Sequence, residues 1–197
     1  SFKSFPMHHG YLRADATKVA AWRKRFAALG PGPYVGISWM GGTTKTRRQL
    51  RTIPLSQWGE ILGQSAQFIS LQYGDARPDI HAIRDLGITL HDWPEAISDY
   101  DETASMISAM DLVISVCTAV VHLAGALGKA VWVMVPATAE WRYMSDGEEM
   151  PWYPSVRLFR QSYGSMGTWA PTIQRVSLEL QKKLRQGDQN GHILPKQ

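Results

Sequence analysis

The sequence predicts an α/β protein built on one doubly wound, six-stranded parallel sheet. Short apolar runs alternate with helical patterns along most of the chain, which is the order of elements typical of α/β folds. Two of the runs, VISV and VWVMV, are apolar at every or nearly every position, as expected for parallel strands that are buried on both faces. With 197 residues, of which 44% are hydrophobic, the chain is long enough for one well-buried domain and too short for two of ordinary size.

Each element is predicted from its hydrophobic period and its boundary residues. The first helix, over residues 14–29, places Val19, Trp22 and Phe26 on one face and is closed by the turn GPGP. The predicted strands are residues 34–39, 68–72, 88–90, 112–116, 130–135 and 156–160. The other predicted helices are residues 56–63, 79–86, 102–110, 118–127 and 171–184. For the helix that starts at residue 102, the candidate caps are Ser98 and Asp101.

The domain organisation follows from the same patterns. Residues 1–30 are expected to be a linker and a lead-in helix, residues 31–185 a Rossmann-like domain, and residues 186–197 a polar, flexible tail. Residues 1–11 show no periodicity, so they are either a linker or an arm docked on the domain.

The composition indicates the cellular compartment of the protein and the class of its binding partner. The single cysteine, Cys117, excludes a disulfide within the chain and is typical of a reducing compartment. The sequence contains no signal peptide and no apolar run of transmembrane length, so we expect a soluble, cytoplasmic protein without a membrane span. The net charge of +4 would suit nucleic acid, but no nucleic-acid-binding module accompanies it. We therefore expect no nucleic acid partner and one site for an anionic small molecule.

The most informative stretch is DLVISVCTAVVHLAGALGKAVW, in which a buried strand is predicted to run directly into a helix that opens at Thr118. The first N–H groups of such a helix are unpaired, and together with the positive end of the helix dipole they favour phosphate. Thr118 and His122 are four residues apart and share one helix face, so the imidazole can reach the same anion. Two alternatives stay open: Thr118 is an ordinary N-cap, and His122 packs between the helix and the sheet.

A second loop is predicted to meet this helix start. In a sheet of order 3-2-1-4-5-6 the first and fourth strands are neighbours, so the loops after them converge beyond their carboxyl ends. The loop after the first strand, residues 40–53, contains Gly41 and Gly42, whose backbone can approach a ligand closely, and cations such as Lys45 and Arg51 that can neutralise a diphosphate. It has neither the P-loop spacing nor the dinucleotide fingerprint. The alternative is a solvated basic loop with a glycine turn.

Other chemistry-bearing residues have simpler explanations. The adjacent His8 and His9 lack a spaced third ligand, so we predict no metal site. Cys117 has no acid–base partner in the sequence and is expected to be a small buried residue rather than a nucleophile. Residues that could shape the rim of a pocket are Tyr153, Arg157 and Arg160. Carboxylates that follow the second and third strands, one of which could bind ribose hydroxyls, are Asp75, Asp79, Asp92, Glu95, Asp99 and Asp101.

Several segments match a known family: VGISWMGG, RTIPLSQW, FISLQ, DLVISVCTAVVHLAGALGKAVWV and WYPSVRLFRQ, followed by Trp169. Over residues 11–184 the chain resembles the C-terminal, nucleotide-sugar-binding half of a GT-B glycosyltransferase of family 9, the heptosyltransferase-like type. More narrowly, it resembles the bacterial tetratricopeptide-linked glycosyltransferase-like proteins. The resemblance implies that the predicted sheet is a single GT-B half-domain.

The resemblance also implies a nucleotide-diphosphate sugar as the ligand. Taken with the glycine-containing loop, the residues expected at the donor's phosphates are Gly41, Gly42, Lys45, Arg51, Thr118, Ala119, Val120 and His122. The residues expected at the nucleoside are Gln72, Asp75 and Trp93. The family is inverting and binds its donor without metal, so neither a metal nor a cofactor is expected.

The family's catalytic base and acceptor site lie in an N-terminal domain, which would be the missing partner of this chain. No residue here is therefore predicted to be catalytic, and we expect no sugar transfer by the chain alone; the parent would be a hexosyl- or heptosyltransferase. Family members usually carry Asp where this chain has Cys117. This departure motivates the alternative of a degenerate GT-B-like domain that acts as a protein-interaction module. A nicotinamide-dependent oxidoreductase ranks last because the glycine fingerprint is missing.

Overall fold

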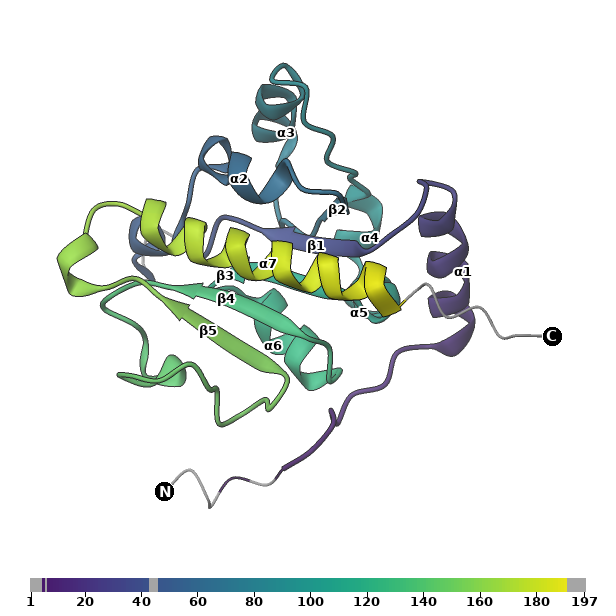
Figure 1. Cartoon of the computed structure of the whole chain (residues 1–197). Helices are drawn as coiled ribbons and strands as arrows, with labels where there is room; N and C mark the ends of the chain where they lie inside the picture. The colour runs from purple at the N-terminus through teal and green to yellow at the C-terminus, as the bar shows by residue number, and fades with distance from the viewer. Residues whose placement is uncertain (1–4, 6, 43–45, 191–197) are drawn as a thin grey trace.

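The computed structural model of the chain describes residues 5, 7–42 and 46–190. In this part of the chain the sheet has five strands, all parallel, in the order β2-β1-β3-β4-β5 (Figure 1). The strands are β1 (Tyr34–Ser38), β2 (Gln67–Ser70), β3 (Leu112–Val116), β4 (Val131–Val135) and β5 (Val156–Arg160). The α-helices are α1 (Ala16–Ala27), α2 (Gly59–Leu62), α3 (Arg77–Arg84), α4 (Pro94–Ser98), α5 (Tyr100–Ala109), α6 (Ala119–Ala126) and α7 (Ala170–Asn190). Short 3₁₀ turns are η3 (Arg48–Arg51), η4 (Leu55–Trp58), η5 (Trp141–Tyr143) and η6 (Tyr163–Ser165).

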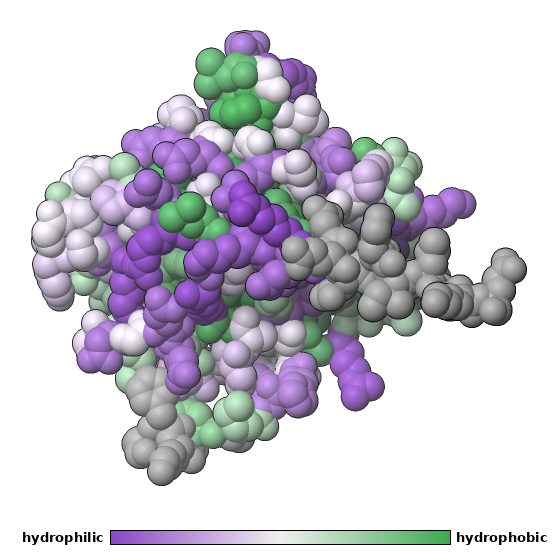
Figure 2. Space-filling model, in the orientation of Figure 1, coloured by the Kyte–Doolittle hydropathy of each residue, from purple (hydrophilic) through white to green (hydrophobic). Residues whose placement is uncertain are grey.

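Helices cover both faces of the sheet, so each face has its own hydrophobic core. On one face α1, α5 and α6 contribute Trp22, Met106 and Val121 to the core. On the other face α2 and α7 contribute Ile61 and Val176. Figure 1 shows α7 crossing in front of the sheet with α6 behind it. The outward side of α7 belongs to the largely hydrophilic surface that Figure 2 shows, as expected for an amphipathic helix.

The α/β class, the parallel sheet and the pairing of the first with the fourth predicted strand are confirmed, but the prediction of six strands is wrong. Residues 88–90 form no strand, and the segment pairs with β2 only at a single bridge at His91. Two backbone hydrogen bonds join them: Ser70 N–H donates to the His91 carbonyl at 2.7 Å, and His91 N–H donates to the Phe68 carbonyl at 2.9 Å. Pro94 then opens α4, so the segment is too short to extend the pairing.

Each predicted helix differs from the structure at one end or both, and α4 is not predicted; the ends of α5 and α7 are the most informative. The cap of α5 is Asp99, whose carboxylate accepts hydrogen bonds from the N–H groups of Asp101 at 2.9 Å and Glu102 at 3.1 Å. Neither predicted cap, Ser98 or Asp101, has that role, because α4 ends at Ser98 and α5 already includes Asp101. The last helix, α7, continues to Asn190, beyond its predicted end at residue 184.

The segment before α1 is docked on the domain rather than extended as a linker. The N–H groups of Tyr11 and Leu12 both donate to the Ala126 carbonyl at the end of α6, at 2.8 and 2.9 Å. A Cβ atom on Gly10 would lie 2.7 Å from the Gly128 nitrogen, so the two backbones are in direct contact. This contact requires glycine at both positions, and both also have positive φ, 103° and 73°.

Gly36, in the middle of β1, leaves room for two buried side chains that pack against the sheet. A Cβ atom at this position would lie 2.5 Å from both Leu71 Cδ1 and Met110 Sδ, which are buried. These side chains would have to move within a close-packed core.

We predict that Gly36→Ala destabilises the folded state by about 1–3 kcal/mol, because the added methyl overpacks this core. Chemical denaturation measures the change. Gly59→Ala is the matched control: Gly59 is helical and exposed, with nothing within 4 Å of its added Cβ, so this variant should be neutral or slightly more stable. Equal effects of the two substitutions would contradict the packing argument.

Candidate functional site

The two loops that follow β1 and β3 meet at the carboxyl edge of the sheet, as the sequence predicts. The strands pair up to Ser38 and Ser115. Beyond them, a Cβ atom on Gly41 would lie 2.6 Å from the Cys117 carbonyl oxygen and 3.0 Å from the Arg51 carbonyl oxygen. Gly41 is therefore needed where three stretches of backbone converge.

The start of α6 presents backbone donors at this meeting point. Thr118 occupies the N-cap position, but its hydroxyl makes no cap hydrogen bond and instead pairs with Ser115 Oγ at 3.1 Å. Within the described residues, the N–H groups of Ala119 and Val120 have no hydrogen-bond partner, and the first N–H that is paired is that of Val121, with the Thr118 carbonyl at 3.2 Å. Because Ala119 is exposed, these donors and the helix dipole can receive an anion.

Arg51 lies beside the helix start, but its charge is already paired. Its side chain is 11% exposed, and Nη1 forms an ion pair with Glu140 Oε1 at 2.7 Å. Nη2 donates to the Thr46 carbonyl, and the buried Nε has no partner among the described residues. Gly42, at φ 78°, leaves room for this guanidinium, which a Cβ atom would overlap. Of the remaining predicted phosphate ligands, Lys45 lies outside the described residues.

His122 is half-buried on α6 and packs against two aromatic rings. Its ring centroid lies 6.2 Å from that of Tyr143 and 5.7 Å from that of Tyr153. Burial, with a smaller contribution from Arg142, lowers the pKa of His122, so the imidazole is neutral near pH 7. It can offer a hydrogen bond to a ligand but not a positive charge.

The three predicted nucleoside residues do not form one cluster. Gln72 is buried and fully engaged: its Oε1 accepts from the N–H groups of Trp39 at 3.0 Å and Met40 at 2.9 Å, and its Nε2 donates to the Met40 carbonyl at 3.2 Å. It holds the loop after β1 in place. Asp75 is exposed at the end of β2, and hydrogen bonds from Arg77 lower the pKa of its carboxyl group.

Trp93 points away from the other two residues. Its ring centroid lies 5.3 Å from that of Trp22 and 5.8 Å from that of Phe26, so it packs against α1. Gln72 and Asp75 line a cavity of about 440 Å³ from which Trp93 is absent.

An apolar cavity beside the start of α6 was not expected from the sequence. It has a volume of about 300 Å³ and includes Ala119 and Val120 of α6 among its lining residues. Its other lining residues are Leu71, Tyr73, Ile97, Ser98, Tyr100, Thr103 and Leu123. Tyr73 and Tyr100 are 77% and 61% exposed. The sequence signal that could have indicated this cavity is the pair of large aromatic residues Tyr73, in the loop after β2, and Tyr100, at the start of α5.

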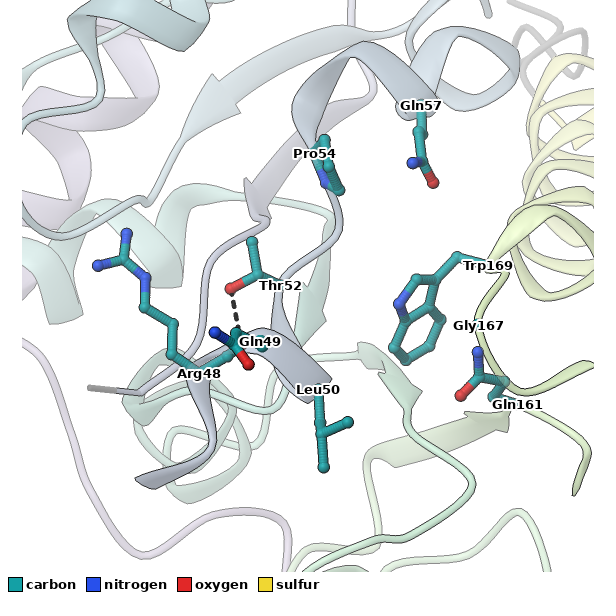
Figure 3. A pocket seen from close by; sticks show the side chains of 9 residues that line it. All are labelled: Arg48, Gln49, Leu50, Thr52, Pro54, Gln57, Gln161, Gly167 and Trp169. Atoms are coloured by element: carbon teal, nitrogen blue, oxygen red, sulfur yellow. Dashed lines mark hydrogen bonds between the residues drawn. The ribbon is translucent and has the colours of Figure 1, made fainter. Parts of the chain in front are cut away.

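A third cavity, of about 470 Å³, lies between η3 and the segment after β5 (Figure 3). Trp169, Leu50 and Gln161 face it in this view. Both ends of the Gln161 amide are hydrogen-bonded to backbone groups: Nε2 donates to the Thr168 carbonyl at 2.8 Å, and Oε1 accepts from Ala137 N–H at 3.3 Å. No residue of α6 lines this cavity, so it is separate from the free helix start.

Of the three expected pocket-rim residues, Tyr153 lines a cavity of about 280 Å³ with His122, whereas Arg160 and Arg157 are structural supports. The guanidinium of Arg160 donates to the carbonyls of Met144 at 3.1 Å, Asp146 at 2.9 Å and Gly147 at 2.6 Å, and also to that of Tyr143. It therefore fixes the loop that follows η5. Arg157 pairs instead with two carboxylates, Glu148 at 2.8 Å and Glu179 at 2.9 Å. Among the described residues no group of three or more His, Cys, Asp or Glu could hold a metal ion.

The geometry defines a class of protein: an α/β domain in which a helix with unpaired N–H groups starts at the switch point of a parallel sheet. The chain has the fold of one half of a GT-B glycosyltransferase of family 9. It superimposes on the ADP-heptose lipopolysaccharide heptosyltransferase II of E. coli with a TM-score of 0.64 and 15% identity, covering 90% of this chain and 54% of that one. With the family 9 glycosyltransferase of Veillonella parvula the TM-score is 0.58 and the identity 8%, over 79% of this chain and 44% of that one. The resemblance predicted from the sequence is confirmed at the level of the fold.

A curated relative gives a closer match in sequence. The chain is 36% identical over 185 residues to Protein FlbA of Caulobacter vibrioides. The match covers 90% of this chain but only 30% of FlbA, so the chain spans less than a third of that relative. No protein-family model matches the chain. In the described part of the chain, no helix is long and apolar enough to cross a membrane.

Cys117 stands where family members usually carry Asp. It is buried, and its surroundings make the thiol unreactive. Its side chain is 2% exposed, and burial raises the pKa of the thiol to about 12. This agrees with the expectation of a small buried residue rather than a nucleophile.

We predict that a thiol reagent such as DTNB labels the folded chain very slowly near pH 8 and labels one thiol per chain at once in denaturant. At that pH a pKa of about 12 instead of 9 leaves about a thousandfold less thiolate in the folded state. The chain has a single cysteine, so the readout is unambiguous. Rapid, stoichiometric labelling of the folded chain would show that the thiol is accessible after all.

Proposed function

We propose that this chain is the nucleotide-sugar-donor-binding half of an inverting, metal-independent glycosyltransferase of family 9. The observation that carries the proposal is the start of α6, where the N–H groups of Ala119 and Val120 are unpaired. The loop after β1, which carries Arg51, packs at Gly41 against Cys117, just before this helix start. Backbone donors at a helix N-terminus suit a diphosphate, which a flat hydrophobic surface would not bind. The fold shared with the E. coli heptosyltransferase supports the same assignment.

The donor's parts can be assigned to neighbouring features. The diphosphate would lie on the amides of Thr118, Ala119 and Val120. The base would enter the apolar cavity beside Ala119, where the exposed rings of Tyr73 and Tyr100 offer stacking surfaces. Asp75, in the adjoining cavity at the end of β2, is the carboxylate placed to meet ribose hydroxyls.

Arg51 would neutralise the donor's phosphates after leaving Glu140. The guanidinium now pairs with a carboxylate that is 37% exposed, and a phosphate can replace that partner without leaving Arg51 unpaired. During transfer, the helix start and Arg51 would stabilise the charge that develops on the leaving nucleotide.

Transfer itself would need the other half of the parent protein. A GT-B acceptor site and base are expected in an N-terminal domain, and we assign no catalytic residue to this chain. The heptosyl or hexosyl identity of the sugar, the link to tetratricopeptide repeats and a cytoplasmic location stay predictions from the sequence.

A second candidate function is a degenerate GT-B-like domain that binds another protein. Two observations favour it: Arg51 is already paired with Glu140, and the thiol of Cys117 stands where the family usually has a carboxylate. The two candidates differ in nucleotide binding, which the second does not require.

We predict saturable binding of one of UDP, GDP, ADP or CMP in parallel calorimetric titrations of the chain. Arg51→Ala should weaken that binding by about 1–3 kcal/mol, since it removes a charge-assisted contact to phosphate. Arg157→Ala is the matched control: like Arg51, Arg157 is an ion-paired arginine, but it lies on β5, pairs with Glu148 and Glu179, and lines neither of the cavities assigned to the nucleoside.

Unchanged affinity in Arg51→Ala would remove Arg51 from the site. Failure of the chain to bind any of the four nucleotides would favour the protein-interaction module.

A further inference from the structure

Two arginines share the carboxylate of Glu140, which lies in the loop after β4, directly before η5. Its Oε1 lies 2.7 Å from Arg51 Nη1, and its Oε2 lies 3.4 Å from Arg142 Nη1. Each oxygen of the carboxylate therefore meets a different guanidinium group. A bound oxyanion would be held between two cations in the same way.

Of the partners in the ion pair between Arg51 and Glu140, the carboxylate is the one that can leave. The Arg51 side chain is only 11% exposed, so its charge needs a neighbouring anion. The Glu140 side chain is 37% exposed and can turn toward water. Arg51 also has one donor that its present contacts leave unused, since its buried Nε has no partner among the described residues.

A cavity of about 270 Å³ opens beside this ion pair, between the loop after β1 and the loop after β4. Its lining residues are Thr46, Arg47, Leu50, Arg51, Pro136, Thr138, Ala139 and Glu140. Glu140 is the one carboxylate among these residues, whereas two of them are arginines. Arg47 forms no ion pair in the part of the chain that the structure describes. Displacement of Glu140 would therefore leave a cavity lined by two positive charges, which suits an anion.

The shared carboxylate is within electrostatic reach of the start of α6. Burial is the main cause of the raised pKa of the Cys117 thiol, but the charges of Arg51 and Glu140 also act on it. Burial is likewise the main cause of the lowered pKa of His122, with further contributions from Arg142 and Glu140. An anion at the start of α6 and the Glu140 carboxylate would therefore repel each other and compete for the same cations.

We propose that Glu140 is an internal competitor, which occupies the arginines until an anionic ligand displaces it. The inference rests on the proposed function, because it concerns regulation of the site that contains Arg51. A ligand with a single negative charge would only replace what Glu140 already supplies. A diphosphate has the charge and the oxygens to meet Arg51 and Arg142 together, so Glu140 makes the site favour diphosphates.

The test is calorimetric titration of the intact chain with inorganic pyrophosphate, and in parallel with UDP, GDP, ADP and CMP. An ion pair that is formed about nine-tenths of the time lowers the apparent affinity of its competitor about tenfold. We therefore expect Glu140→Gln, which removes the charge and keeps the shape, to bind pyrophosphate about tenfold more tightly than the unsubstituted chain.

A second variant covers the case in which Arg51 without a carboxylate partner destabilises the fold. Glu140→Asp keeps a negative charge near Arg51 but shortens its reach, so we expect a folded chain with a smaller gain in affinity. Thermal unfolding of both variants without ligand shows whether each one is folded.

Glu148→Gln is the matched control, because Glu148 also pairs with two arginines, Arg157 at 2.8 Å and Arg175 at 3.0 Å. It lines neither the cavity beside Arg51 nor those beside α6, so it reports the general effect of removing one negative charge. In addition, the gain in Glu140→Gln should vanish when Arg51→Ala is introduced, because the competition requires that arginine.

Three results would overturn the inference: an equal gain in Glu148→Gln, a gain that persists beside Arg51→Ala, or no gain in folded Glu140 variants. Absence of pyrophosphate binding by every form would overturn it as well. The nucleotide titrations separate it from the proposed function. Nucleotide binding without a gain in Glu140→Gln would overturn this inference alone. A gain for pyrophosphate without binding of any nucleotide would support it and contradict the donor site.

Discussion

The close approach of the loop after β1 to the loop after β3 is the constraint on which the rest of the site depends. It follows from the parallel pairing of the two strands, which ends at Ser38 and Ser115. Both loops therefore begin at the same edge of the sheet. Gly41 makes the contact possible because any Cβ atom there would meet the Cys117 carbonyl. The same contact brings the backbone of Arg51 close to Cys117, the residue before the N-cap of α6.

Buried polar side chains hold this arrangement rather than bind ligand. Gln72 satisfies two N–H groups and one carbonyl of the loop after β1, and a side chain without these groups would leave buried donors unpaired. Arg160 holds the loop after η5 in a similar way, because its guanidinium group donates hydrogen bonds to carbonyls of that loop. The described parts of the loops after β1 and η5 are thus held by the amide of Gln72 and the guanidinium group of Arg160.

The sequence predicts the fold better than it predicts the site. Strand β3 has the predicted bounds, because a nearly continuous apolar run between polar boundaries leaves little choice of register. Strand β5 also has the predicted bounds, although its apolar residues are interrupted by Arg157. Residues 88–90 fail as a strand because one bridge to β2 is all that their length allows. At the site, the sequence correctly predicts that the loops after β1 and β3 meet. It could not show that Arg51 meets Glu140 or that Trp93 turns toward α1, since both depend on partners far away in the chain.

The most direct test of the account is amide NMR of the isotopically labelled chain, titrated in turn with UDP, GDP, ADP and CMP. With the nucleotide that binds, the account predicts the largest shifts at the N–H groups of Ala119 and Val120, with smaller shifts at Leu71 and Ile97 in the adjoining cavity. Shifts confined to the cavity around Trp169, or no shift with any of the four, would contradict the claim that the start of α6 is a nucleotide-phosphate site.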